Sequence, residues 1–107
     1  MNLTTEQAEQ IAYTILQQMG GDGRLHAMVG ATVLAFEKDG SLTFRFKSCR
    51  KANFVKITLN GLDLYDMTFM KIHSKTYEVK EVKTFENLYS DNLKETFEAF
   101  TGLYLSL

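Results

Sequence analysis

The side chains capable of metal or nucleophilic chemistry are few and lie far apart in the sequence. His26, Cys49 and His73 fall in three separate predicted loops. Zinc ligands usually come in close pairs such as Cys-x-x-Cys or His-x-x-x-His, and the sequence contains no such pair. We therefore expect no metal site and no cofactor.

Cys49 is the one cysteine of the sequence and therefore the only candidate for a thiol nucleophile. A histidine distant in sequence can activate a cysteine, and the neighbouring Arg50 and Lys51 favour the thiolate. An ordinary loop thiol explains the same residues equally well. Asp63 and Asp66 do not form a catalytic carboxylate pair, because Asp is common at turns and strand starts. The sequence therefore predicts no catalytic residues and no enzyme.

Basic side chains without any acid occupy residues 41–62. Alternation along two predicted strands places Arg45, Lys47 and Lys56 on one face. Arg50 and Lys51 fall in the loop that joins these strands. An aromatic ring on the same face can stack a nucleic-acid base, as in sheets that bind single strands. The predicted binding residues are Arg45, Lys47, Arg50, Lys51, Phe54 and Lys56.

The same charges also have an ordinary explanation, because exposed strands and loops use lysine to stay soluble and to avoid edge-to-edge pairing. With 12 basic and 13 acidic residues, the chain has a net charge of −1. Nucleic-acid-binding domains are usually basic overall. We therefore rank a protein partner ahead of nucleic acid.

A predicted second helix adds a charge of the opposite sign. It carries Glu86, Asp91, Glu95 and Glu98 against Lys94. An acidic helix and a basic strand pair make the chain dipolar, which can steer a protein partner or a homo-oligomeric contact. A solvated helix face with acids near its amino end accounts for the same pattern.

Periodicity predicts a first helix over residues 4–19. Its apolar residues recur at helical spacing, Thr4 and Gln7 can form a capping box, and Gly20-Gly21 can end the helix. A second helix is predicted over residues 84–102, with Thr84 as N-cap and Gly102 as C-cap. The final residues LYLSL are expected to pack back onto the sheet.

Five strands are predicted between the helices, at residues 28–36, 42–47, 54–59, 65–72 and 76–83. Asp39-Gly40 indicates a tight hairpin in which both central residues have positive φ, and Asn60-Gly61 indicates a second turn. The order predicts one α+β domain over residues 1–107. We expect two layers: a five-stranded antiparallel meander sheet with the N-terminal and C-terminal helices packed on one face, and the other face open.

ITLNGLDLYDMTFMKI (residues 57–72) and YSDNLKETFEAFTGLYLSL (residues 89–107) resemble segments of a family of small proteins encoded by tailed phages and prophages. The resemblance extends to the first helix with Gly20-Gly21 and to residues 28–31. The family has no assigned activity, so the resemblance implies a phage context and no catalytic residues. Related sequences vary in length between residues 47 and 54, within the basic loop.

The sequence also allows an expectation for the cellular compartment and for the function. A lone cysteine, no signal segment and no long apolar run indicate a reducing cytoplasm and no membrane association, and the resemblance implies that this is the cytoplasm of a bacterium. We expect a small non-enzymatic binding protein that acts on a host or phage protein, as a regulator or inhibitor of a host system does. The alternative is a nucleic-acid-binding protein that uses the basic face.

Overall fold

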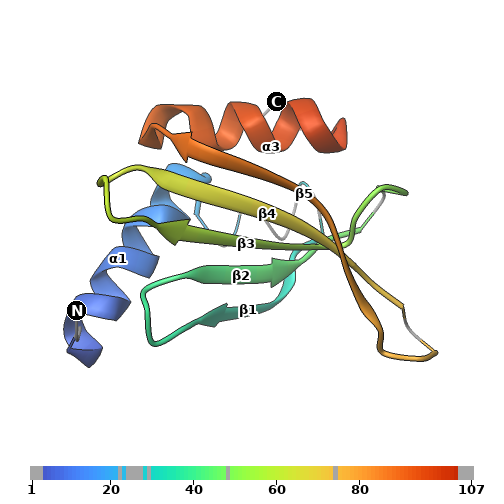
Figure 1. Cartoon of the computed structure of the whole chain (residues 1–107), viewed down its shortest axis with the longest axis horizontal. Coiled ribbons are helices and arrows are strands. Elements are labelled where there is room, and N and C mark those ends of the chain that lie inside the picture. The colour runs from blue at the N-terminus through green and yellow to red at the C-terminus, as the bar shows by residue number, and fades with distance from the viewer. Residues whose placement is uncertain are drawn as a thin grey trace.

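Helix α1 (Thr5–Gln18) precedes a five-stranded sheet, and helix α3 (Leu93–Thr101) follows it in the computed structural model (Figure 1). The model describes residues 4–21, 23, 28, 30–47, 49–73 and 75–103, without the side chains of residues 33 and 34. His26 and the final LYLSL, apart from Leu103, lie outside the described residues.

The sheet is an antiparallel meander, as predicted. Its strands lie in the order β1-β2-β3-β4-β5, so each pairs only with its neighbours in the chain. The strands are β1 (Thr32–Phe36), β2 (Leu42–Arg45), β3 (Phe54–Leu59), β4 (Tyr65–Ile72) and β5 (Val79–Leu88).

Helix α1 begins with the predicted capping box. The Thr4 hydroxyl accepts a hydrogen bond from the Gln7 backbone N–H at 3.1 Å, and the Gln7 side chain accepts one from the Thr4 N–H at 2.9 Å. The helix ends before Gly20 and Gly21, which have φ of 106° and 88°. Glycine adopts such angles without the clash that a Cβ would cause.

Both helices pack on the same face of the sheet, which confirms the two-layer prediction. Phe97 of α3 lies against Phe44, Phe46 and Phe69, with ring centroids 5.1–6.0 Å apart. Ile15 of α1 belongs to the same cluster. The other fully buried large side chains in the cluster are Met19, Leu42, Val55, Ile57, Met67 and Leu93.

Strand β1 starts four residues later than predicted. The apolar run from Met28 indicated a strand from residue 28, but β1 begins at Thr32 and Met28 is helical. Gly30 has φ of 65°, which an extended strand cannot contain. The apolar run therefore divides at Gly30.

The predicted second helix is wrong over residues 84–88, which continue strand β5. Thr84 and Phe85 pair with Thr68 and Met67 of β4. A 3₁₀ turn at Ser90–Asn92 follows, and α3 begins only at Leu93. The predicted C-cap is confirmed, because Gly102 ends α3 with φ of 75°.

The first hairpin is present, but its turn differs from the prediction. Gly40 has φ of 85°, whereas Asp39 does not have a positive φ. The Glu37 N–H donates to the Ser41 carbonyl at 2.9 Å, and the Gly40 N–H donates to the Glu37 carbonyl at the same distance. The loop therefore has three residues, with a single left-handed glycine at its end.

Asn60 joins the β3–β4 turn to β5. Its side-chain amide donates to an Asp66 carboxylate oxygen at 3.0 Å and to the Asn87 side-chain oxygen at 2.8 Å. Asn87 has φ of 58° and lies where the β4–β5 register shifts. This bulge leaves Phe85 and Leu88 on the same side of the sheet, where both face α3.

Candidate binding surfaces

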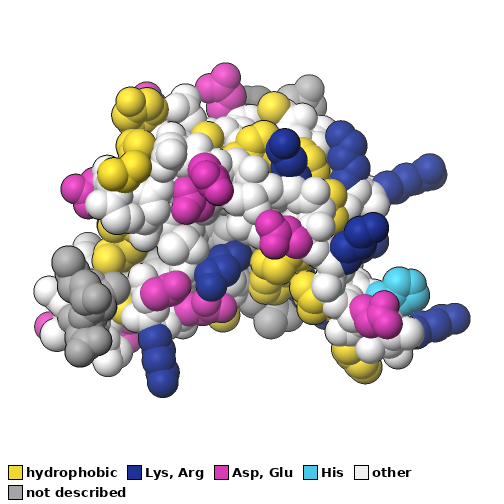
Figure 2. Space-filling view, in the orientation of Figure 1, with side chains coloured by type: hydrophobic (Ala, Val, Ile, Leu, Met, Phe, Trp, Pro, Cys, Tyr) yellow, Lys and Arg dark blue, Asp and Glu magenta, His cyan; other side chains and the backbone are white. Residues whose placement is uncertain are grey.

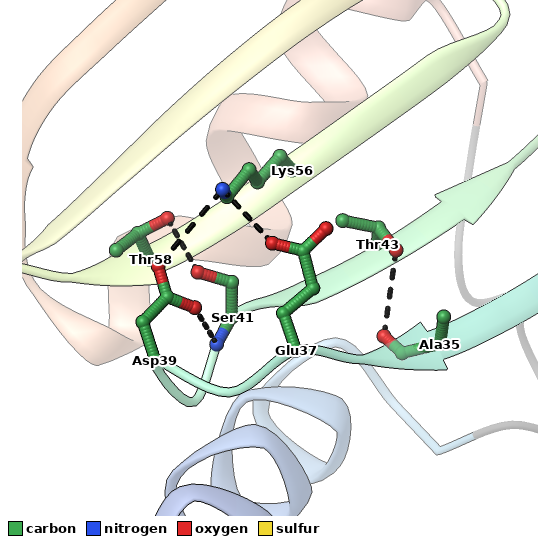
Figure 3. A network of polar contacts seen from close by, with 7 residues as sticks. All are labelled: Ala35, Glu37, Asp39, Ser41, Thr43, Lys56 and Thr58. Carbon is green, nitrogen blue, oxygen red and sulfur yellow. Dashed lines mark hydrogen bonds and ion pairs between the residues drawn. The ribbon is translucent and has the colours of Figure 1, made fainter. Parts of the chain in front are cut away.

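The predicted basic residues do not form one cationic surface, because Lys56 is paired with acids. Its Nζ lies 2.9 Å from Glu37 Oε2 and 3.9 Å from Asp39 Oδ2 (Figure 3). Both acids come from the β1–β2 hairpin, just before the acid-free stretch of the sequence. The hydrogen bond with Glu37 raises the pKa of Lys56, against the opposing effect of partial burial.

Asp39 is held in the same polar network. One carboxylate oxygen accepts the Ser41 N–H at 2.9 Å, and the Ser41 hydroxyl lies 2.9 Å from that of Thr58 (Figure 3). Partial burial works to raise the pKa of Asp39. The hydrogen bonds from Ser41 and the charge of Lys56 outweigh burial, so that the pKa is lowered.

Lys51 points to the helix-covered side of the sheet, which corrects its predicted place beside the open face. Its Nζ donates to the Phe100 carbonyl at 3.2 Å and lies 5.2 Å from the centre of the Phe100 ring. Phe100 is in the last turn of α3, where a cation is favoured by the helix dipole. Lys51 therefore belongs to the surface around α3.

Of the remaining predicted residues, only Arg45 and Phe54 are placed on the open face by strand pairing. Arg45 and Phe54 are half-buried cross-strand partners on the side opposite the core residue Val55. Lys47 is exposed, and its methylene groups lie over Gly30, where an added Cβ would meet Lys47 Cδ at 3.4 Å. Arg50 is exposed in the β2–β3 loop.

A groove of about 450 Å³ between α3 and β5 is the main surface that the sequence interpretation missed. We call it the α3–β5 groove. It is lined by Lys51, Phe85, Leu88, Asn92, Glu95, Thr96, Ala99 and Phe100. Phe85, Leu88 and Phe100 are half-buried, so an apolar floor reaches the surface. Figure 2 shows hydrophobic side chains beside basic ones over this part of the molecule.

Lysines border the aromatic floor of the α3–β5 groove. Lys83 Nζ lies 5.5 Å from the centre of the Phe85 ring, as Lys51 lies over Phe100. Lys71 and Lys80 are directly opposite each other in β4 and β5, close to Lys83 in the sheet. The four lysines and the two rings thus combine cationic and apolar surface.

The sequence interpretation missed this groove because residues 84–88 were assigned to a helix. That assignment removed Phe85 from the sheet and from its position against α3. The useful signal was Asn87, because asparagine tolerates positive φ and often marks a bulge. The sequence around Lys51 does not indicate that its side chain reaches α3, since its partner Phe100 is 49 residues away.

A second hollow, of about 630 Å³, lies between α1 and β1. Tyr13 and Phe36 line it and are 52% and 44% exposed. The charged side chains that line it are Glu6 and Glu9. Its charged lining is therefore entirely acidic, whereas the α3–β5 groove is lined by one lysine and one glutamate and has Lys83 beside its floor.

Cys49 is half-buried against the hydrophobic core. Of the two histidines that could activate it, His26 lies outside the described residues and His73 is exposed in the β4–β5 hairpin. Over the described ranges, no three His, Cys, Asp or Glu side chains are grouped to hold a metal ion.

In the part of the chain that the structure describes, no helix has the length and hydrophobicity to cross a membrane.

Comparison with known proteins finds no matching family model, no matching curated protein and no matching solved structure.

Proposed function

We propose that this chain is a small non-enzymatic binding protein that docks on another protein through the α3–β5 groove. The observation that carries the proposal is the apolar floor of Phe85, Leu88 and Phe100, bordered by Lys51 and Lys83. Protein interfaces commonly combine a buried aromatic centre with a polar and charged rim. The groove has both parts in the unbound chain.

The resemblance to tailed-phage proteins supports a host or phage protein as the partner. In this setting the chain acts in the bacterial cytoplasm as a regulator or inhibitor of a host system. A docking surface made by α3 and β5 suits this role, because binding there needs no reactive side chain.

The docking surface is tested by filling it. Ala99 is an exposed groove residue on α3, and Ala99→Trp places an indole in the groove. Gln17→Trp, at an exposed position of α1, is the matched control. Tagged wild-type protein and the Q17W variant should retain the same stoichiometric partner from bacterial lysate, and A99W should lose it. Equal capture by A99W would overturn the proposal.

Nucleic-acid binding is the second candidate, and the pairing of Arg45 with Phe54 favours it. The two side chains are cross-strand neighbours on the open face, and Lys47 and Arg50 are exposed in the segment that follows β2. A guanidinium beside an aromatic ring suits a phosphate and a stacked base. The ion pairs of Lys56 and the orientation of Lys51 reduce this surface, so it ranks second.

Labelled single- and double-stranded DNA and RNA distinguish this candidate at two salt concentrations. Binding through phosphates should weaken steeply with salt and should fade in the double variant R45A/F54A. Lys38→Ala, in the β1–β2 turn, is the control for a lost surface charge. An absence of binding at low salt would eliminate the second candidate.

A further inference from the structure

We propose that the ligand of the α3–β5 groove is an acidic segment of a partner protein that carries one large apolar side chain. This inference rests on the proposed function and names the chemistry of the partner. The apolar side chain occupies the floor of the groove, and the acidic groups face the lysines at its edge.

Lysines lie close together beside the groove. Lys71 and Lys80 are direct cross-strand partners, an arrangement of like charges that destabilises a sheet. Among the described residues, no carboxylate lies within ion-pair distance of Lys51, Lys71, Lys80 or Lys83; the ion pairs present there belong to Lys56. An acidic ligand would relieve this repulsion, whereas a basic ligand would increase it.

The apolar part of the ligand follows from the floor of the groove. Phe85 and Phe100 lie edge to face with centroids 5.7 Å apart, and both remain half-exposed. A leucine or phenylalanine placed on these rings would remove apolar surface from water. Removal of this apolar surface from water favours binding.

The charges within the groove also give the ligand a direction. Lys51 lies at the end near Phe100, whereas Glu95 lines the groove near the start of α3. The acidic groups of the ligand should therefore lie toward Lys51 and Lys83, away from Glu95. Recognition is by side chains, because two register shifts and two lysines make β5 a poor edge for adding a strand.

Fluorescence anisotropy with three labelled peptides tests this inference. The first has glutamates around a central phenylalanine, the second replaces the glutamates with lysines, and the third replaces the phenylalanine with serine. We expect only the first to bind, and its affinity to fall as salt is raised. The acidic lining of the α1–β1 hollow does not favour this peptide, so the signal reports the α3–β5 groove.

Two charge reversals should change the affinity in opposite directions. Lys83→Glu should weaken binding of the acidic peptide about tenfold, and Glu95→Lys should strengthen it about threefold. Lys38→Glu makes the same charge change in the distant β1–β2 turn and should leave the affinity unchanged. A gain of affinity in E95K cannot arise from misfolding, so the inference is testable even if K83E is unstable.

The two proposals fail in different ways. If A99W loses a captured partner but the acidic peptide does not bind, or if K83E and K38E behave alike, the acidic ligand is wrong and the groove remains the docking site. Preferential binding of the basic peptide would also overturn the acidic ligand. If A99W retains every partner, the groove itself is wrong.

Discussion

The Lys56 ammonium lies 2.9 Å from the Glu37 carboxylate. This ion pair links β3 to the residue that follows β1, across the intervening strand β2. Lys56 is the cross-strand partner of Thr43, which is only 4% exposed although it lies on the face opposite the helices. Part of the open face is therefore closed by an ion pair. The sequence predicted a cationic surface here, but the charge of Lys56 is balanced by Glu37 and Asp39.

Replacing Lys56 with Met should lower the free energy of unfolding by about 0.2–1 kcal/mol near neutral pH, the usual range for an exposed ion pair. Lys56 has a pKa raised above 10.5, so its contribution is present below pH 10.5 and is lost as pH rises through the folded-state pKa. Asp39 has a pKa lowered below 3.8, so its contribution is lost as pH falls through that lower value. Urea unfolding at a series of pH values measures the loss of stability at both the alkaline and the acidic end.

Lys38→Met is the control for this pH dependence, since Lys38 is exposed in the same turn and forms none of these ion pairs. The K38M variant should keep the loss of stability that the wild-type protein shows at alkaline pH. A K56M deficit that persists unchanged at pH values above the folded-state pKa of Lys56 would contradict the assignment of the stabilisation to the charged pair.

Gly40→Ala should destabilise the protein by about 2 kcal/mol or more. The residue has φ of 85°, and an added Cβ would lie 2.9 Å from Ile11 Cβ in α1. Thermal unfolding should therefore show a lower midpoint. Gly61→Ala is the matched turn variant, with nothing within 4 Å of the added Cβ, and it should change stability by less than about 0.5 kcal/mol.

Asn53→Ala should expose the backbone of Ile72. The Asn53 amide donates to the Ile72 carbonyl at 2.9 Å, and its oxygen accepts the Ile72 N–H at 2.8 Å. Loss of both bonds should cost about 1–3 kcal/mol. Hydrogen exchange should show faster exchange of the Ile72 amide. Asn92→Ala is the control, because Asn92 makes no side-chain capping bond; equal effects of the two substitutions would refute this role.

Tyr77→Gly should stabilise the β4–β5 hairpin by about 0.5–1 kcal/mol. Tyr77 has φ of 58°, an unfavourable angle for a bulky residue, and its side chain is 77% exposed, so little packing is lost. Chemical denaturation gives the change. Tyr89→Gly is the contrast, since Tyr89 is also exposed but has φ of −78°, and it should show no gain.

Local periodicity was enough to predict α1, β3 and β4, because each has one continuous pattern of buried positions. The second helix was misplaced for the same reason. Phe85, Tyr89, Leu93 and Phe97 recur every four residues, and this spacing also fits a strand followed by a helix. The pairing of Thr84 with Thr68 shows that this segment is a strand and not a helix. The spacing of apolar residues along the sequence gives no information about that pairing.

Alternation correctly placed Arg45, Phe54 and Lys56 on the face opposite the core. It could not identify the partners of Lys56, which come from another hairpin, or the reach of Lys51 to Phe100. These contacts depend on how strands and helices meet in three dimensions. Which residues share a strand face was therefore predictable, whereas the charge balance of each surface was not.

The meander topology bears on how the polypeptide acquires its native state. Every strand pairs with the strand made just before or just after it, so most backbone pairing needs only short loops to close. Proteins rich in such nearby contacts fold faster than those that must join distant segments. We expect successive hairpins to assemble in the order of synthesis, and a nascent chain to begin this assembly before its last helix has left the ribosome.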